Sequence, residues 1–267
     1  MTLGAQFLAL HHRDHPFIIP NPWDAGSAKV LEALGYEALA TTSSGFAGTL
    51  GRLDGNITRD EAIAHSAALV EAVNIPVSAD LENCFAHDPA GVAETAQLAV
   101  DVGLAGFSVE DYSGDDNNPI YELAHAVERV TAAVEVAHAA SDPRVVTARA
   151  ESHLHGGTDL AATIARLQAF QEAGADVLYA PGVSDIDDVR TLASAVDRPV
   201  NVLALPGAPN LATLGVAGAR RVSVGGGFAL VATSALVEAA TQTLETGDWN
   251  FWSMTAQSGL AREAWKA

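Results

Sequence analysis

The chain is poor in cysteine and has no long apolar run. Its only cysteine is Cys84, so no intrachain disulfide can form, which suits a reducing compartment, and we expect a cytoplasmic protein. No stretch of about 18 apolar residues is free of charges, and the first residues have no basic region followed by an apolar core. Neither a transmembrane helix nor a signal peptide is therefore expected.

Basic residues are also scarce. Lysine and arginine together number 14 against 33 aspartates and glutamates, which gives a formal net charge of −19. Such a charge repels nucleic acids and anionic membranes, so we expect neither as a partner. It also repels small carboxylates, so any anion site would need a local metal, an arginine or backbone N–H donors. No linker or low-complexity tract divides the chain, and we expect one domain over residues 1–267.

What the sequence does contain is a regular rhythm of short apolar runs, about 25 to 35 residues apart. The lack of polar alternation predicts strands that are buried on both faces. The eight predicted strands are Phe17–Pro20, Ala38–Thr42, Pro76–Asp80, Gly106–Glu110, Val145–Arg149, Val177–Ala180, Val200–Ala204 and Arg221–Val224. The predicted helices between and after them are 24–34, 59–73, 89–102, 121–140, 157–173, 184–196, 208–217 and 226–245.

Thr58 and Ser184 are the expected N-caps of two of these helices, because acidic residues follow each of them in the first turn. Strand followed by helix, repeated eight times, predicts parallel strands that close a (β/α)8 TIM barrel; the alternative is an open doubly wound sheet. The residues before 16 are predicted to form one short helix over the bottom of the barrel. Residues 248–265 are predicted to form an amphipathic, aromatic-rich helical tail that packs on this barrel or on another subunit.

Carboxylates gather where predicted strands end, which is the face that carries the active site in such barrels. Asp80 and Glu82 end the third strand and Glu110 ends the fourth, while Asp54 can reach the same mouth from a loop. Carboxylates this crowded need a cation, shared protons or several donors. Oxygen ligands favour a hard ion, so we expect Mg2+ or Mn2+ with much of its water retained.

Groups that could hold an anion follow other strands. Arg149 ends the fifth strand and could clamp a carboxylate or support a developing oxyanion; it could equally neutralise Glu110 or Glu151. Ser43, Ser44 and Gly45 offer hydroxyls and N–H groups in what we predict to be a tight turn. The glycines at 225–227 open the last helix and are a weaker candidate for an anion site.

Taken together, these stretches resemble the isocitrate lyase/phosphoenolpyruvate mutase superfamily. The matching stretches are Asn21–Ala28, Thr42–Gly45, Gly51–Asp54, Ser78–Glu82, Ser108–Asp111, Ala148–Arg149 and Pro199–Leu203. The resemblance implies Mg2+ near Asp80, surrounded by Glu82, Glu110 and Asp54, with an α-oxo-acid or its enolate on the metal. It implies substrate contacts from Ser43–Gly45 and Arg149, and also from Trp23 and Asn201, which lie in matching stretches. It further implies a dimer or tetramer in which the last helix is swapped between subunits.

One loop departs from that pattern. Lyases of the superfamily carry a Lys-x-Cys-Gly motif after the fourth strand, and the mutase and related hydrolase also use a lysine there. Here residues 111–121 contain neither lysine nor cysteine. An inert role is expected for Cys84, whereas Tyr112 and three histidines near the mouth, at 87, 153 and 155, are candidates for the missing acid or base.

Three functions remain open. The first is Mg2+-dependent C–C bond cleavage of a small α-oxo or 2-hydroxy carboxylic acid, by a lyase or an oxaloacetate-type decarboxylase or hydrolase, through an enolate. In it Arg149, Glu110 and Asp54 are the expected catalytic residues. The second is P–C bond chemistry of the phosphonopyruvate hydrolase or phosphoenolpyruvate mutase kind, with Asn117 and Asn118 near a phosphoryl group. The third is a barrel that binds an oxo-acid without turnover.

Overall fold

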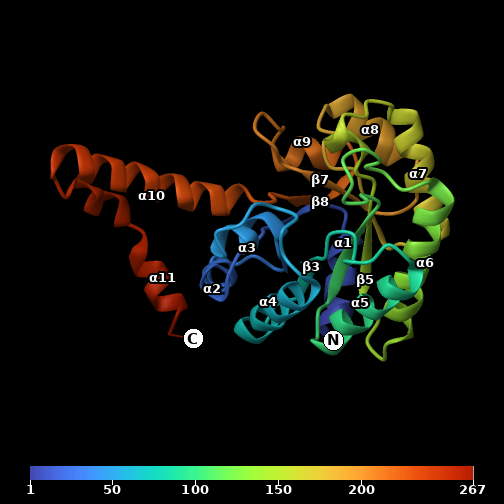
Figure 1. The fold of residues 1–267 in the computed structure, drawn as a ribbon, viewed down its shortest axis with the longest axis horizontal. Coiled ribbons are helices and arrows are strands. Elements are labelled where there is room, and N and C mark those ends of the chain that lie inside the picture. Colours follow the sequence, from blue (N-terminus) through green and yellow to red (C-terminus); the bar gives the residue numbers. More distant parts are fainter. Residues whose placement is uncertain (267) are drawn as a thin grey trace.

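The computed structural model describes residues 1–266 and forms a (β/α)8 barrel (Figure 1). Every strand overlaps the run predicted for it, because runs of mainly apolar residues are the segments that can be covered on both faces. The strands are β1 Phe17–Ile19, β2 Leu39–Ala40, β3 Val77–Asp80, β4 Gly106–Glu110, β5 Val145–Arg149, β6 Val177–Tyr179, β7 Val200–Leu203 and β8 Ala219–Ser223.

The strand order rules out the open-sheet alternative. All paired strands are parallel, each lies beside its sequence neighbour, and β8 returns to β1 with Arg221 in register with Phe17. The remaining seam, between β1 and β2, has one backbone hydrogen bond, from Ala40 N–H to the Pro20 carbonyl (3.1 Å). The barrel is therefore closed or nearly closed all round.

Asn21 strengthens this seam with its side chain. Its amide NH2 donates to the carbonyls of Ala40 and Thr41, both at 3.1 Å. Its amide oxygen accepts N–H groups from Val224 (2.9 Å) and Gly225 (2.8 Å), just beyond β8. One buried side chain thus joins the ends of three strands.

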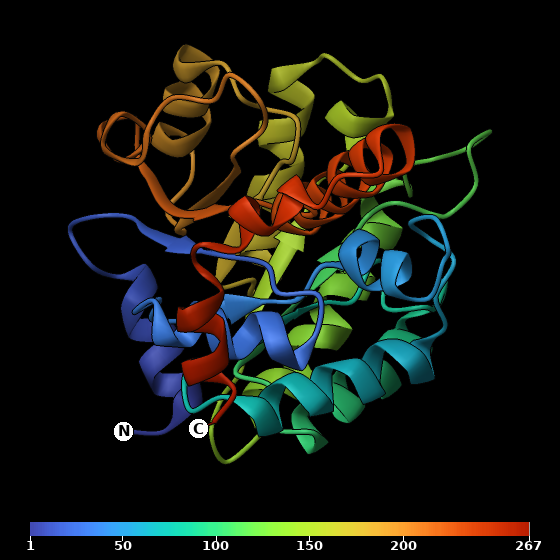
Figure 2. The same ribbon diagram turned by 90° about the vertical axis from the view of Figure 1, so that its left-hand side faces the viewer.

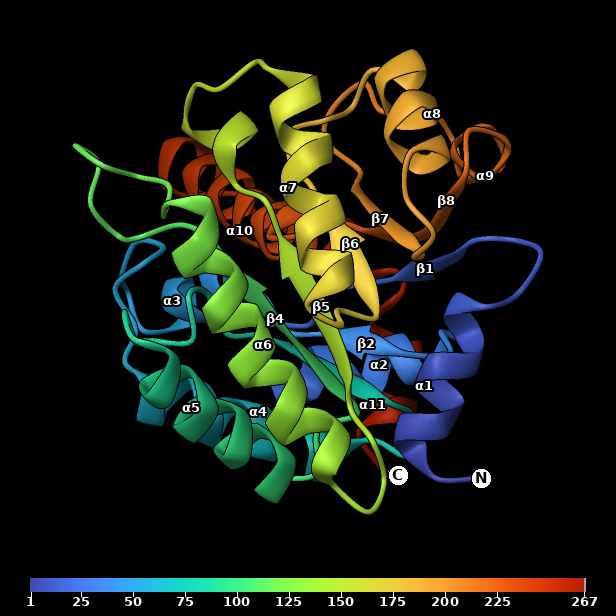
Figure 3. The ribbon, with the colours of Figure 1, turned by 90° about the vertical axis from the view of Figure 1, so that its right-hand side faces the viewer.

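Helices surround the strands on the outside (Figure 3). They are α2 Ala25–Ala33, α4 Arg59–Ala72, α5 Pro89–Asp101, α6 Leu123–Ala139, α7 Leu160–Glu172, α8 Ile186–Ser194 and α9 Leu211–Val216. Thr58 caps α4 in a capping box with Glu61, as predicted. The predicted cap at Ser184 is wrong: Asp185 caps α8, because its carboxylate accepts N–H groups from both Asp187 and Asp188.

The bottom of the barrel is closed by the predicted N-terminal helix, α1 Leu3–His11. Phe7 and Leu10 are buried with Phe17, Val145 and Val177 at the N-terminal ends of the strands. A separate, larger apolar core fills the space between the strands and the outer helices. The bottom is thus filled largely by apolar side chains, and the cavity opens at the other end of the strands.

The last long helix leaves the barrel. α10, Gly227–Thr246, projects away from the strands and has no buried residue (Figures 1 and 2). Its large apolar side chains are exposed, among them Leu230, Val231, Leu236, Val237 and Leu244. Among residues 1–266 there is no helix that could cross a membrane by its length and hydropathy.

The tail is helical in two short pieces rather than in one continuous amphipathic helix. The left-handed Gly247 ends α10, and a 3-10 helix at Asn250–Thr255 then precedes the short α11, Ser258–Ala264. α11 returns to α2, where the Trp265 indole N–H donates to the Gly26 carbonyl (3.2 Å). Trp249 and Trp252 nevertheless stay 67% and 64% exposed, so residues 1–266 leave much of the aromatic surface of the tail uncovered.

Candidate active site

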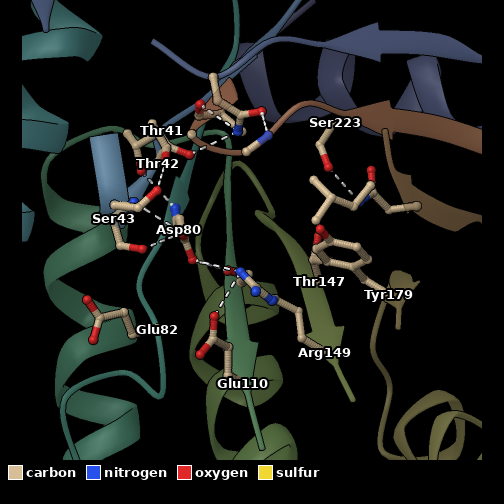
Figure 4. A pocket seen from close by; sticks show the side chains of 18 of the residues that line it. Thr41, Thr42, Ser43, Asp80, Glu82, Glu110, Thr147, Arg149, Tyr179 and Ser223 are labelled. Atoms are coloured by element: carbon tan, nitrogen blue, oxygen red, sulfur yellow. Dashed lines mark hydrogen bonds and ion pairs between the residues drawn. The ribbon is translucent and has the colours of Figure 1, made fainter. Parts of the chain in front are cut away.

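A cavity of about 410 Å³ opens at the carboxyl ends of the strands (Figure 4). It brings together most of the predicted site residues: Ser43, Ser44, Asp54, Asp80, Glu82, Glu110, Arg149 and Asn201. Trp23 and Gly45 do not line it. They line a neighbouring cavity of about 340 Å³ between α10 and α3, Ser43–Thr49. A substrate contact from either residue stays a prediction.

Arg149 lies at the centre of the acidic groups. Its Nη1 is 2.9 Å from Asp80 Oδ1 and 2.8 Å from Glu110 Oε1, and its Nε is 2.7 Å from Glu151 Oε1. Burial opposes the charge, but Glu110 and then Glu151 and Asp80 outweigh it and raise the pKa of Arg149 well above its usual value. This arrangement matches the alternative in which Arg149 neutralises its acidic neighbours.

Asp80 is held from both sides. Its second oxygen, Oδ2, accepts the N–H (3.2 Å) and the hydroxyl (3.0 Å) of Ser43, while Ser108 lies 3.4 Å from Oδ1. Ser43 is the first residue of α3, so the helix dipole also favours the carboxylate. The polar end of β3 is therefore fixed before any ligand arrives.

The predicted tight turn at residues 43–45 is instead the first turn of α3. The N–H of Ser43 is used by Asp80, and the N–H of Gly45 donates to Thr42 Oγ1 (3.2 Å). Ser44 lies at the cavity, and its hydroxyl shares a hydrogen bond with Thr42 Oγ1 (3.1 Å). Ser44 is thus the member of this segment best placed to meet a ligand.

Glu82 differs from Asp80, Glu110 and Glu151 because it makes no ion pair within residues 1–266. It follows β3 in a left-handed conformation (φ 49°), as do Cys84 (φ 58°) and Phe85 (φ 53°). Three such residues in one short turn are strained, which is typical of functional sites. The buried Oε1 of Glu82 has no hydrogen-bond partner, and burial, followed by Asp80 and Asp54, raises the pKa of Glu82 to about 8.

Glu110 is deeper than Glu82, and its side chain is only 10% exposed. Burial raises the pKa of Glu110 well above its usual value; Arg149 opposes this shift, while Glu151 and Asp80 add to it. Asp54, by contrast, lies on an exposed loop at the rim of the cavity. The exposure of these acids therefore decreases from Asp54 at the rim, through Glu82, to the buried Glu110.

This donor set fits a hard divalent cation, although among residues 1–266 no three such side chains already converge as ready metal ligands. Mg2+ needs only one or two carboxylates and keeps several waters. Asp80 is fixed in place. Glu82 has an oxygen without a hydrogen-bond partner, and a nearby cation would favour the ionised form of its carboxyl group. That Asp80 binds the ion directly, with Glu82, Glu110 and Asp54 around it, stays a prediction, because both oxygens of Asp80 already accept hydrogen bonds from Arg149, Ser43 and Ser108.

Of the four candidate acid–base residues, two line the cavity and two do not. Tyr112 and His155 line the cavity, and their rings stack at 4.1 Å between centroids. His87 instead contacts the Tyr121 hydroxyl (2.5 Å), and His153 faces Thr163 (3.2 Å); neither lines the cavity.

The expected inertness of Cys84 fits its surroundings. The thiol is fully buried, and burial raises its pKa to about 12, so it stays protonated.

Deeper in the cavity lie residues that sequence reasoning missed: Thr147 on β5, Tyr179 on β6 and Arg221 on β8. The ring of Tyr179 packs against Arg149, with 5.0 Å between the guanidinium carbon and the ring centroid. Attention to strand ends alone passed over Arg221. The available signal was an arginine inside a strand that must be buried on both faces.

Comparison with known proteins agrees with this geometry. The phosphoenolpyruvate phosphomutase family model matches residues 7–244. An uncharacterized protein of Mycobacterium tuberculosis is 35% identical over 82% of this chain and 81% of its own. The 2-methylisocitrate lyase of Escherichia coli is 30% identical over 74% of this chain and 68% of its own.

Solved structures give the same result. A Burkholderia cenocepacia protein, provisionally assigned as a lyase/mutase, superposes with a TM-score of 0.96 at 46% identity, over 99% of this chain and 96% of its own. Further relatives are a 2,3-dimethylmalate lyase and an oxaloacetate decarboxylase. The chain therefore belongs to the phosphoenolpyruvate phosphomutase family, within the superfamily of enzymes that includes isocitrate lyase-type lyases and oxaloacetate decarboxylases.

Proposed function

We propose that the protein is a Mg2+-dependent enzyme that cleaves a C–C bond in a small α-oxo or 2-hydroxy carboxylic acid by way of an enolate. The observation that carries this proposal is the set of acids around Arg149 at the mouth of the barrel, with Asp80 fixed by Ser43 and Glu82 left without a partner. Mn2+ would serve the same oxygen ligands. Decarboxylation or hydrolysis of an oxaloacetate-like acid is the favoured reaction, because it asks least of a protein acid.

The cation would be held by Asp80 directly, and by Glu82, Glu110 and Asp54 through water. When bound, it supplies the positive charge that an enolate needs. Arg149 would also stabilise the negative charge of the enolate. Ser44 and Asn201 line the cavity where the substrate's oxygens would lie. The positive charge at the mouth would thus come from the bound cation and Arg149, while Ser44 and Asn201 orient the substrate.

Tyr112 and His155 are the groups proposed to return a proton to the enolate carbon. Both line the cavity, and burial, followed by the hydrogen bond to Asp116, raises the pKa of Tyr112. Its hydroxyl therefore keeps its proton at neutral pH and can donate it. Water could take over this step, so loss of either side chain should slow turnover without abolishing it.

Two observations weigh against the P–C bond alternative. Asn117 and Asn118 lie on an exposed loop and do not line the cavity, and Asn117 is engaged with Asp115 (3.0 Å). No lysine is present between residues 111 and 121 to hold a phosphoryl group.

Product analysis by NMR tests the reaction. Oxaloacetate with Mg2+ should yield pyruvate if the enzyme is a decarboxylase, or oxalate and acetate if it is a hydrolase. Isocitrate and 2-methylisocitrate should be cleaved only in traces, because general acid–base help is typically worth about 10² to 10⁴ in rate. Robust cleavage of either would contradict this prediction. Binding without any product would instead favour the non-catalytic barrel.

We also propose that two chains exchange α10, in a dimer or a tetramer. Support comes from the exposed apolar side chains of α10, such as Leu236, and from the cavity that it forms with α3 and Trp23. Light scattering at micromolar concentration should give twice or four times the chain mass of 27.6 kDa. A particle of 27.6 kDa would contradict the exchange.

A further inference from the structure

Arg221 is a buried cation whose partners are all neutral. Its side chain belongs to β8, the residue is 6% exposed, and it lines the same cavity as the acidic groups. Its Nε donates to the side-chain oxygen of Asn201 (2.8 Å), and its Nη1 lies 3.3 Å from His11 Nε2. It forms no ion pair with any carboxylate in residues 1–266.

The partner below Arg221 cannot supply a negative charge. His11 Nδ1 lies 2.8 Å from the Phe7 carbonyl, which can only accept, so the proton of the neutral ring sits on Nδ1 and Nε2 accepts from Arg221. Burial, and then Arg221 itself, lowers the pKa of His11 well below its usual value. Arg221 remains a cation, since burial lowers its pKa only to about 10. A buried charge of this kind is costly unless an anion joins it.

Three unused donors point to where that anion would lie. Within residues 1–266, the Nη2 groups of Arg221 and Arg149 have no hydrogen-bond partner, although the other nitrogens of both guanidinium groups do. The hydroxyl of Thr147, a residue that is 1% exposed, also has no partner. All three residues line one cavity, and Thr147 lies beside the Tyr179 ring (Figure 4).

We propose that Arg221, Arg149 and Thr147 form a carboxylate subsite at the floor of the cavity, and that it takes the second carboxylate of a short dicarboxylic acid. This rests on the proposed function, in which the first carboxylate and its oxo or hydroxy neighbour bind at the acidic mouth. A planar carboxylate suits the fork of a guanidinium and can accept a hydroxyl as well. A monocarboxylic acid would leave Arg221 buried and uncompensated, so the floor selects against it.

Calorimetry in Mg2+ with matched ligands tests the subsite. Malate and 2-hydroxybutanoate share the metal-chelating end and differ in that malate has a carboxylate where the other has a methyl group. The wild type should bind malate at least about 10-fold more tightly, and Arg221→Met should weaken malate binding about 10- to 100-fold. Binding of 2-hydroxybutanoate and oxalate should change by less than about two-fold, because neither needs the floor.

Arg221→Lys is the control for a general loss of structure, because lysine keeps the positive charge but lacks the two parallel N–H donors of the guanidinium. It should retain part of the preference for malate. An undiminished preference in Arg221→Met, or no preference in a wild type that binds oxalate, would overturn the subsite.

If the wild type binds neither oxalate nor 2-hydroxybutanoate in Mg2+, the proposed function fails and the subsite is judged separately. Crystals soaked in sodium bromide should then show an anomalous peak beside Arg221 that Arg221→Met lacks. Absence of that peak in the wild type would overturn the subsite as well.

Discussion

The mouth and the floor of the cavity carry opposite imbalances of charge. At the mouth, Asp80, Glu110 and Glu151 share the single cation Arg149, and Glu82 adds an unpaired acid. At the floor, Arg221 has only neutral partners. An ion pair between an acid of the mouth and Arg221 would have been the more stabilising arrangement. In the proposed function the acidic mouth receives the cation and the basic floor receives an anion, so a ligand would bind in one orientation.

The largest expected effect comes from removing the fixed acid at the mouth. Asp80→Ala should abolish tight Mg2+ binding and lower turnover by at least about 10³-fold, because the metal contributes several kcal/mol of charge stabilisation. The fold should persist, since the remaining acids repel each other less. Calorimetry with Mg2+ and the oxaloacetate assay measure both. Asp60→Ala, at a side chain that is 92% exposed, is the matched control; full activity of Asp80→Ala would place the metal elsewhere.

Removing the cation of each region should have opposite consequences for stability. Arg149→Met leaves two buried carboxylates and the partly buried Asp80 without a counter-charge, and should cost about 3–5 kcal/mol at pH 8. The loss should shrink at pH 5, where acids such as Glu110 take up protons. Arg221→Met removes a charge that has no counter-ion, and should be neutral or stabilising in anion-poor buffer. Urea unfolding of both variants decides this, and equal destabilisation would break the contrast between the regions.

A smaller effect concerns the pH dependence that Glu82 imposes on the metal-free protein. Its folded pKa of about 8 lies above the ordinary value of 4.5, so its contribution to stability is full below pH 4.5 and is lost as the pH rises through 8. Glu82→Gln should therefore flatten the decline of the melting temperature between pH 5 and about 9. A variant that declines as steeply as the wild type would assign that slope to other groups, such as Asp111, whose pKa burial raises to about 6.

The smallest effect is expected at the floor. Thr147→Val removes a buried hydroxyl without a partner, and should raise the free energy of unfolding by up to about 1 kcal/mol in anion-poor buffer. The same change should weaken malate binding by about 2- to 10-fold, as expected for loss of one hydrogen bond. Chemical denaturation and calorimetry measure the two quantities. Thr131→Val, at a hydroxyl that bonds within α6 to the Val127 carbonyl, is the matched control.

The sequence predicted the barrel well because eight apolar strands leave few other ways to bury themselves. It also predicted which acids would meet, since the ends of parallel strands converge on one face. It did not predict that Arg149 would be shared by three acids, because that depends on side-chain reach across strands. It missed α3, whose seven residues read as a glycine-rich turn, and it missed Arg221, whose partners Asn201 and His11 lie 20 and 210 residues away.

The seam beside Asn21 has a consequence for how the chain assembles during synthesis. β1 leaves the ribosome early, yet the strand that it pairs with, β8, is about 200 residues later. Until β8 emerges, β1 has an unpaired edge, and the Asn21 amide oxygen lacks the N–H groups of Val224 and Gly225. Closing so long a loop is slow, because its entropy cost precedes any reward from the contacts. The growing chain therefore keeps an unpaired sheet edge until β8, Ala219–Ser223, has emerged, and a stop codon shortly before β8 would leave that edge unpaired permanently.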